Sequence, residues 1–152
     1  MNQLLRSPWS GEFDALLDRA STSLILCAPF IGRAPCDRVR RRLSALHDAR
    51  FQMTVLTDLS RDNLLSGATD VTAIADVVRD FPTATIRFLP SLHAKVYVAD
   101  DTHAIVTSAN MTDSGLHRNF EYGMLFDDPR TVRAIKCDVL QYASLGSGVD
   151  RA

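Results

Sequence analysis

Residues 92–123 read LHAKVYVADDTHAIVTSANMTDSGLHRNFEYG and contain three apolar runs that are typical of β-strands. The runs occupy about 93–99, 103–109 and 120–126, and the short polar segment between the first two predicts a tight β-hairpin. Polar side chains interrupt the runs at five positions, which are His93, Lys95, Ser108, Asn110 and Glu121. Burying such groups without partners is costly, so we expect them to be paired or to line a cleft.

The rest of the chain alternates between helical and strand patterns. Apolar residues recur at helical spacing, and short apolar runs indicate buried strands. The predicted helices lie at 11–20, about 35–46, 71–78 and 132–140, with a helical turn at 61–66, and the further strands lie at 23–30, 51–57 and 83–89. The order αβαβαβββα predicts an α/β sandwich with a central mixed sheet flanked by helices. We expect one domain over residues 1–152, with its core over about 10–143 and a frayed tail at 144–152.

Composition excludes several classes of protein. The chain has 152 residues, of which 46% are hydrophobic and 23% charged, and its net charge is −1, so any attraction to nucleic acid must come from a local patch. Three widely spaced cysteines form no metal-binding pattern and are typical of a reducing compartment. Neither a signal peptide nor an apolar run of membrane-spanning length is evident, so we expect a cytoplasmic protein without membrane contact.

The five polar residues have the chemistry of a phosphate site. Side chains alternate across a strand, so His93 and Lys95 are expected on one face, and Ser108 and Asn110 on one face of the neighbouring strand. Lysine supplies positive charge, Asn and Ser supply neutral donors, and histidine can attack or transfer a proton. A carboxylate such as Glu121 can hold one imidazole nitrogen and leave the other free. No second histidine or carboxylate cluster stands at metal-binding spacing, so we expect no metal and no cofactor.

The spacing of these residues resembles the motifs of the phospholipase D superfamily. His93-x-Lys95, followed after four residues by Asp100, matches the HxKxxxxD pattern, and residues 107–110 (TSAN) are similar to the GSxN pattern of that family. The resemblance extends over roughly residues 10–140 and implies a phospholipase D-like α/β/α sandwich. A histidine on a strand is often only a core or surface residue, but the joint spacing favours a site.

Two further positions bear on the resemblance. Glu121 stands where nucleases of the family carry the glutamate that binds the catalytic histidine. Thr107 replaces the usual glycine, and its side chain is expected to point away from the site, which leaves open both a packing adjustment and an inactive site. Asp100 is the acid of the motif, and its place at the start of the hairpin favours a structural role.

The resemblance also implies a mechanism that needs two copies of the motif and no metal. One histidine attacks phosphorus and forms a phosphohistidine, and the other protonates the leaving oxygen and then activates water. Since this chain carries one HxKxxxxD motif, we expect a twofold homodimer whose two subunits share one active site. His93 would serve in both roles, Lys95, Asn110 and Ser108 would bind phosphate oxygens, and Glu121 would orient His93.

Substrate contacts outside the motif are less sharply predicted. Six arginines lie between residues 33 and 50, and such a helix face is either a solvated surface or a phosphate-binding patch beside the site. The residues that we expect to touch substrate are Arg33, Arg41, His117 and Arg118.

The sequence thus predicts a metal-independent phosphodiesterase, most simply an endonuclease that cleaves DNA in restriction, defence or repair. A fused or separate domain could supply specificity. Two alternatives stay open: a phospholipase or phosphatidyltransferase, and an inactive phospholipase D-like module that binds nucleic acid or dimerises. The lack of a basic amphipathic helix speaks against the first alternative.

Overall fold

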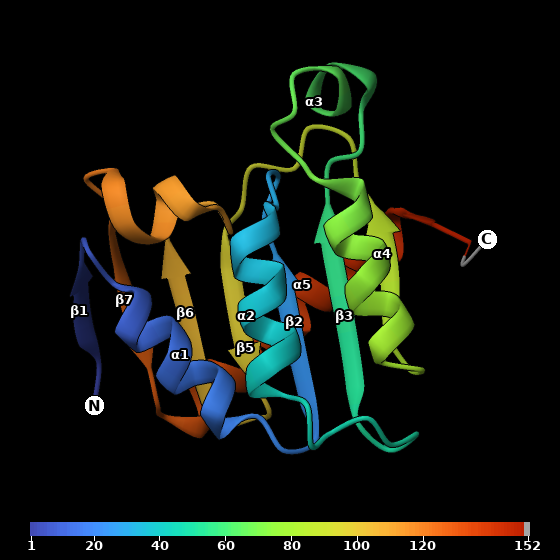
Figure 1. Ribbon diagram of the computed structural model, residues 1–152. Helices are drawn as coiled ribbons and strands as arrows, with labels where there is room; N and C mark the ends of the chain where they lie inside the picture. Colours follow the sequence, from blue (N-terminus) through green and yellow to red (C-terminus); the bar gives the residue numbers. More distant parts are fainter. Residues whose placement is uncertain (151–152) are drawn as a thin grey trace.

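The computed structural model describes residues 1–150, in which eight strands form a single mixed sheet (Figure 1). The strand order across the sheet is β1-β7-β6-β5-β2-β3-β4-β8. The strands are β1 (Gln3–Arg6), β2 (Ser23–Cys27), β3 (Gln52–Thr57), β4 (Thr85–Phe88), β5 (Val96–Ala99), β6 (His103–Thr107), β7 (Tyr122–Phe126) and β8 (Ser147–Gly148). The helices are α1 (Ser10–Arg19), α2 (Arg33–Arg42), α3 (Arg61–Leu65), α4 (Val71–Asp80), the π-helix η1 (Ser114–Arg118) and α5 (Pro129–Leu145).

The sheet combines parallel and antiparallel pairs. Strands β2, β3 and β4 are parallel neighbours, and the crossovers between them contain α2 in the first case and α3 and α4 in the second. Strands β5, β6 and β7 are antiparallel, and β5 also pairs antiparallel with β2. The chain reverses between β5 and β6 at residues 100–102, where Asp100 takes a positive φ of 53°. Because β5 and β6 are antiparallel, the C-terminal end of β6 lies next to the segment that precedes β5.

Each face of the sheet has its own apolar core. Helices α1, α2 and α4 cover one face, and α5 covers the other (Figure 1). The alternation along β2 shows the division, because Leu24 and Leu26 belong to the first core while Ile25 and Cys27 belong to the second, which α5 shares. Both faces are therefore buried, which explains why the strand reads as a continuous apolar run.

The predicted fold class, a mixed sheet flanked by helices, is confirmed. Several boundaries differ. The strands of the hairpin are shorter than predicted, because β5 begins at Val96 and β6 ends at Thr107, so His93 and Lys95 precede a strand and Ser108 and Asn110 follow one. The sequence analysis missed β1, η1 and β8.

The C-terminal segment also differs from expectation. Residues 144 and 145 complete α5, and Ser147 and Gly148 pair with β4 at the edge of the sheet instead of fraying. The part of the predicted tail at 151–152 lies outside the described residues. No helix within residues 1–150 is long and apolar enough to cross a membrane.

Candidate active site

His93 and Lys95 form the centre of the candidate site, on the segment that leads into β5. The Lys95 Nζ atom lies 3.3 Å from each of the two ring nitrogens of His93. Lys95 is only 8% exposed, whereas His93 is exposed to solvent. Burial lowers the pKa of the Lys95 ammonium group, and the negative charge of Glu121 acts in the opposite direction. A buried ammonium group beside an open imidazole is an arrangement that can receive an anion.

Ser108 and Asn110 lie on the loop after β6 and are fixed by neighbouring segments. The backbone N–H of Ser108 donates to the carbonyl oxygen of Tyr122 at 3.0 Å. The side-chain oxygen of Asn110 accepts a hydrogen bond from the backbone N–H of Phe30 at 3.3 Å. This bond occupies the amide oxygen, and no acceptor among residues 1–150 contacts the amide nitrogen. The NH₂ end of Asn110 is therefore the part that can donate to a bound phosphate.

Glu121 has partners that differ from the predicted one. One carboxylate oxygen accepts a hydrogen bond from the Ser108 hydroxyl, and the other accepts from the Asn119 amide at 3.2 Å. Among the described residues it makes no hydrogen bond with His93. The reason lies in the sheet register, because the Ser108 hydroxyl also accepts from the backbone N–H of Tyr122 at 3.1 Å and so lies next to Glu121. Within one subunit, Glu121 positions Ser108 instead of His93.

Asp100 lies in the hairpin turn and binds the start of β2. Its carboxylate accepts hydrogen bonds of 2.7–3.1 Å from five donors, which are the backbone N–H groups of Ser21, Thr22 and Ser23 and the hydroxyls of Ser21 and Thr22. Partial burial acts to raise the pKa of this carboxyl, but the hydrogen bonds outweigh it and lower the pKa from 3.8 to about 2. These contacts favour the structural role for the motif acid.

Thr107 replaces the family glycine and faces Gly123 in the register between β6 and β7. Its hydroxyl donates to the carbonyl oxygen of Tyr122 at 3.3 Å and accepts from the backbone N–H of Ala109 at 3.2 Å. A Cβ atom at position 123 would come within 2.6 Å of the Thr107 Cβ atom. The side chain of Thr107 is thus accommodated by a glycine on the next strand, which is the packing adjustment that the sequence analysis considered.

Gly115 is a site residue that the sequence analysis missed. It belongs to η1, and a Cβ atom there would lie 2.2 Å from the carbonyl oxygen of Asn110. The indole N–H of Trp9 donates to the carbonyl oxygen of Gly115 at 2.9 Å, and the Tyr97 hydroxyl donates to that of Ala109 at 2.9 Å. Both aromatic side chains are buried below the loop that carries Asn110. The signal in the sequence was a glycine five residues after the asparagine, but only the fold shows what it contacts.

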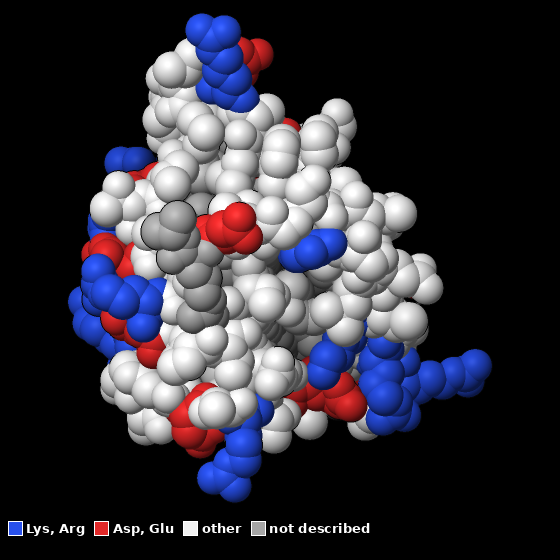
Figure 2. All heavy atoms as spheres, turned by 90° about the vertical axis from the view of Figure 1, so that its right-hand side faces the viewer, with Lys and Arg blue, Asp and Glu red and all other residues white. Residues whose placement is uncertain are grey.

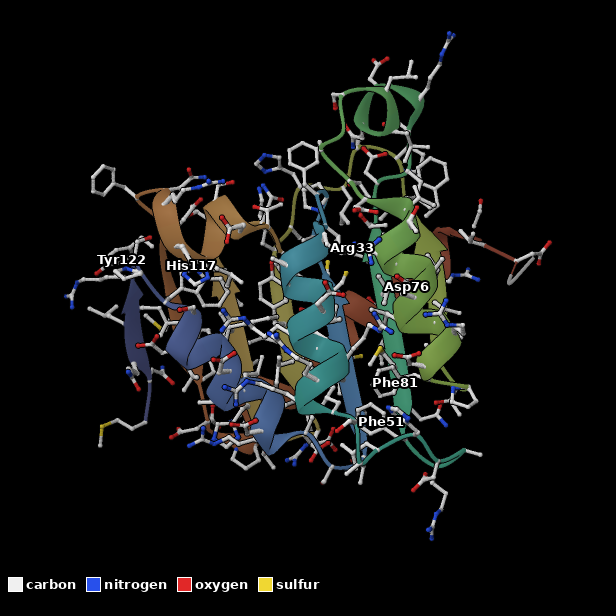
Figure 3. All side chains as sticks on the ribbon, viewed as in Figure 1. Arg33, Phe51, Asp76, Phe81, His117 and Tyr122 are labelled. Atoms are coloured by element: carbon white, nitrogen blue, oxygen red, sulfur yellow. The ribbon has the colours of Figure 1, made fainter. Side chains whose placement is uncertain are left out.

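Most of the arginine cluster is neutralised by acidic residues. Arg33 lies within 2.6 Å of Asp76, 3.5 Å of Asp70 and 3.8 Å of Asp37, and Figure 3 shows Arg33 and Asp76 between α2 and α4. The expected substrate contact of Arg33 is therefore replaced by an ion-pair network. Asp37 lies on α2 itself, four residues from Arg33, but Asp70 and Asp76 belong to the N-cap and body of α4, far away along the chain, and these two partners were missed.

Most of the remaining arginines of α2 follow the same pattern. Arg38 binds Asp14 at 2.8 Å and Arg40 binds Asp80 at 2.6 Å. Figure 2 shows basic and acidic side chains interleaved on the face that it presents, without a broad basic patch. Arg41 is exposed and makes no ion pair within residues 1–150.

His117 and Arg118 lie on η1 and are also partly engaged. The Nε2 atom of His117 lies 3.4 Å from a guanidinium nitrogen of Arg38 and 3.9 Å from a carboxylate oxygen of Asp113. Arg118 lies 3.4 Å from Asp113 and remains 69% exposed. In Figure 3 His117 lies over the α1 side of the sheet. Of the four residues expected to touch substrate, Arg41 and Arg118 keep the most accessible charge.

The donor set of the site suits an oxyanion more than a metal ion. In the described part of the chain, no group of three or more His, Cys, Asp or Glu side chains gathers in a way that could hold a metal. The site instead offers one ammonium group, one amide NH₂ group and one accessible imidazole, whereas the Ser108 hydroxyl, which was expected to bind phosphate, already donates to Glu121. These are the groups that stabilise a phosphoryl group during transfer.

Comparisons with known proteins identify the family and the fold. Residues 13–142 match the family described as "Cardiolipin synthase, PLD-like domain". No curated protein matches the sequence. Among solved structures, the chain is similar to Nuc from Salmonella typhimurium, a phospholipase D family member, with 17% identity, a TM-score of 0.78 and coverage of 98% of this chain and 97% of that one.

Two other solved structures have the same fold. NucT from Helicobacter pylori is 14% identical with a TM-score of 0.78 and coverage of 98% of this chain and 99% of that one. TrmBL2, an archaeal chromatin protein, is 14% identical with a TM-score of 0.69, and the match covers 97% of this chain and 54% of that one. With the family match extending over most of the chain, the protein belongs to the PLD-like domain family of the phospholipase D superfamily.

Proposed function

We propose that this protein is a metal-independent phosphodiesterase, and specifically an endonuclease that cleaves DNA in the cytoplasm. The observation that carries the proposal is the pair of His93 and Lys95, with the lysine ammonium buried and 3.3 Å from both nitrogens of an accessible imidazole. Asn110 adds a free NH₂ donor on the neighbouring loop. The fold shared with Nuc and NucT supports a nuclease within the family.

The proposed reaction has two steps. A ring nitrogen of His93 attacks phosphorus, so that a P–N bond forms while the bond between phosphorus and the leaving oxygen breaks. A second histidine gives its proton to the leaving oxygen and then accepts a proton from water, whose oxygen attacks phosphorus and releases the imidazole. Lys95 and Asn110 bind the non-bridging oxygens, where negative charge must be stabilised in the transition state.

The second histidine is supplied by another copy of the chain. Each chain has one HxKxxxxD motif, and the other three histidines do not lie beside a buried lysine. We therefore propose a twofold dimer in which His93 of one subunit is the nucleophile and the partner's His93 is the general acid and base. Glu121 holds Ser108 in each half of the site through their hydrogen bond.

Cleavage assays in EDTA test the proposal. Single-stranded DNA, double-stranded DNA and RNA are incubated with wild type and with His93→Ala, and the molar mass of both proteins is measured by light scattering. We expect dimers, and metal-free cutting only by wild type. Loss of wild-type activity in EDTA with recovery in Mg²⁺, or equal cutting by both proteins, contradicts the histidine mechanism, and a monomer contradicts the shared site.

A phosphatidyltransferase is the second candidate, because the description of the matched family names cardiolipin synthase. The same chemistry would then use an alcohol in place of water. Transfer of a phosphatidyl group in vesicles containing phosphatidylglycerol, together with no cutting of any nucleic acid, would favour this candidate. Binding of DNA by both proteins without cutting would instead favour the inactive module.

A further inference from the structure

Two exposed aromatic side chains flank Glu121. Phe120 is fully exposed, at 104% of its reference area, and Tyr122 is 55% exposed. They occupy alternate positions on the segment that enters β7, a spacing that places side chains on the same side of an extended chain. Glu121 between them turns its carboxylate to Ser108. Exposed aromatic side chains that stand together, unlike single ones, can form a contact surface for another molecule.

A basic side chain adjoins the aromatic pair. The guanidinium carbon of Arg6 lies 5.9 Å from the centre of the Tyr122 ring, and the two residues are directly opposed in the β1–β7 register. Figure 3 shows Tyr122 at this edge of the sheet. Arg6 is exposed and makes no ion pair within the described chain, unlike Arg33 on the far half of the sheet. Its charge is therefore available to an anion.

We infer that Phe120, Tyr122 and Arg6 form a stacking surface for unpaired nucleobases of a single-stranded nucleic acid. Aromatic rings stack on the faces of bases, and an adjacent guanidinium group binds the phosphates between them. In a duplex the base faces are covered by neighbouring bases, so this surface selects single strands. The surface neighbours the site along the chain, because Glu121, which accepts a hydrogen bond from the Ser108 hydroxyl, lies between the two aromatic residues, whose side chains point to the opposite side.

The inference rests on the proposed nuclease function and adds its substrate class. A strand whose phosphodiester reaches His93 would place its next bases on Phe120 and Tyr122. A second copy of the chain is the other molecule that could cover the exposed Phe120. The basic residue beside the rings favours a polyanion over this second copy, since one chain carries a net charge of only −1.

Binding assays in a non-cleaving background test the inference. Fluorescence anisotropy measures Kd for a single-stranded oligothymidylate and for a DNA hairpin duplex, both with the His93→Ala protein as reference. Adding Phe120→Ala is expected to weaken single-strand binding about tenfold, with less than a twofold change for the duplex. Phe120→Trp keeps a stacking face and is expected to retain the affinity. Tyr142→Ala, which removes an aromatic residue that is 46% exposed on α5, serves as the matched control and should change neither Kd.

Three outcomes would overturn the inference: no change for the single strand, an equal loss for single strand and duplex, or conversion of the dimer to a monomer by Phe120→Ala in light scattering. The last outcome would assign Phe120 to a subunit contact. Hydrolysis of bis(para-nitrophenyl) phosphate by wild type, and its loss in His93→Ala, reports on the proposed chemistry alone. If wild type does not hydrolyse this compound, the proposed phosphodiesterase activity is rejected, while the anisotropy measurements still decide whether Phe120 binds single strands.

Discussion

Replacing Asp100 by Asn should reduce stability without removing the chemistry of the site. Asn tolerates the positive φ of 53° at this position, so the backbone can keep its conformation. The substitution removes the negative charge and turns one acceptor oxygen into an NH₂ donor that faces donors at Ser21 and Thr22. The variant therefore tests the charge-assisted hydrogen bonds that join the hairpin to β2.

The pKa of Asp100 sets the size of the expected loss in the free energy of unfolding. The difference between 3.8 and about 2 corresponds to about 2.4 kcal/mol, because each pKa unit is worth about 1.36 kcal/mol. Solvent screens a partly open carboxylate, so we expect Asp100→Asn to lower the free energy of unfolding by about 1–2 kcal/mol. For a chain of this length the midpoint of thermal unfolding should fall by roughly 2–8 °C.

The same contribution should depend on pH. Because the pKa of Asp100 is lower in the folded than in the unfolded state, its stabilising effect is complete above the unfolded value near 3.8 and is lost as the pH falls through about 2. The difference in stability between wild type and Asp100→Asn should therefore be constant near pH 7 and shrink below pH 4.

Urea unfolding of wild type, Asp100→Asn and Asp101→Asn measures these differences. Asp101→Asn is the matched control, since it removes only an exposed ion pair of 2.7 Å with Lys136 and should cost less than about 1 kcal/mol. The structural reasoning is refuted if Asp100→Asn abolishes cleavage at a temperature where the variant is fully folded, because Asp100 would then act in catalysis.

Further predictions concern the loop of Asn110, the buried lysine and the ion-pair network. Gly115→Ala should lower kcat/KM by roughly 100-fold, because the added Cβ atom would lie 2.2 Å from the Asn110 carbonyl oxygen and would displace Asn110. Gly11→Ala is the control, since a Cβ atom there meets no atom within 4 Å, and equal activity of the two variants would contradict the argument. Because burial lowers the pKa of Lys95, kcat/KM should begin to fall at a pH below the ordinary lysine value of 10.5, and a pH profile that stays flat up to that value would contradict this. Arg33→Gln should lower the thermal midpoint, since Asp37, Asp70 and Asp76 each lose one ion-pair partner, and an unchanged melting curve would show that the contacts of Arg33 are not stabilising.

The sequence predicted the part of the site that depends on local spacing. The pairing of His93 with Lys95 could be predicted because the two residues are close in sequence and the motif fixes their separation. The fold class followed from the alternation of helical and strand periods, which reflects burial on both faces of the sheet. The hairpin turn at Asp100 followed from its polar residues in the same way.

Contacts between distant segments could not be predicted in this way. The hydrogen bond between Glu121 and Ser108 depends on the register of β6 with β7, and a shift of one residue would reverse the faces of the strand. The ion pairs of Arg33 depend on how α2 packs against α4. The number of arginines along the chain therefore overestimates the free positive charge of the helix.

The neutralised arginines bear on how the protein would attract a nucleic acid. Attraction to a duplex depends mainly on contacts with its phosphates, and a helix such as α2, whose arginines are mostly paired with carboxylates, gains little from them. Near the site the accessible positive groups are Arg6, beside the Tyr122 ring, and Arg118, which is 69% exposed, while Lys95 is largely buried. A single strand offers the faces of its bases to Phe120 and Tyr122 in addition to its phosphates, whereas stacking covers the base faces in a duplex. With a net charge of −1, the chain depends on this second kind of contact, and this argues for an unpaired strand as the substrate.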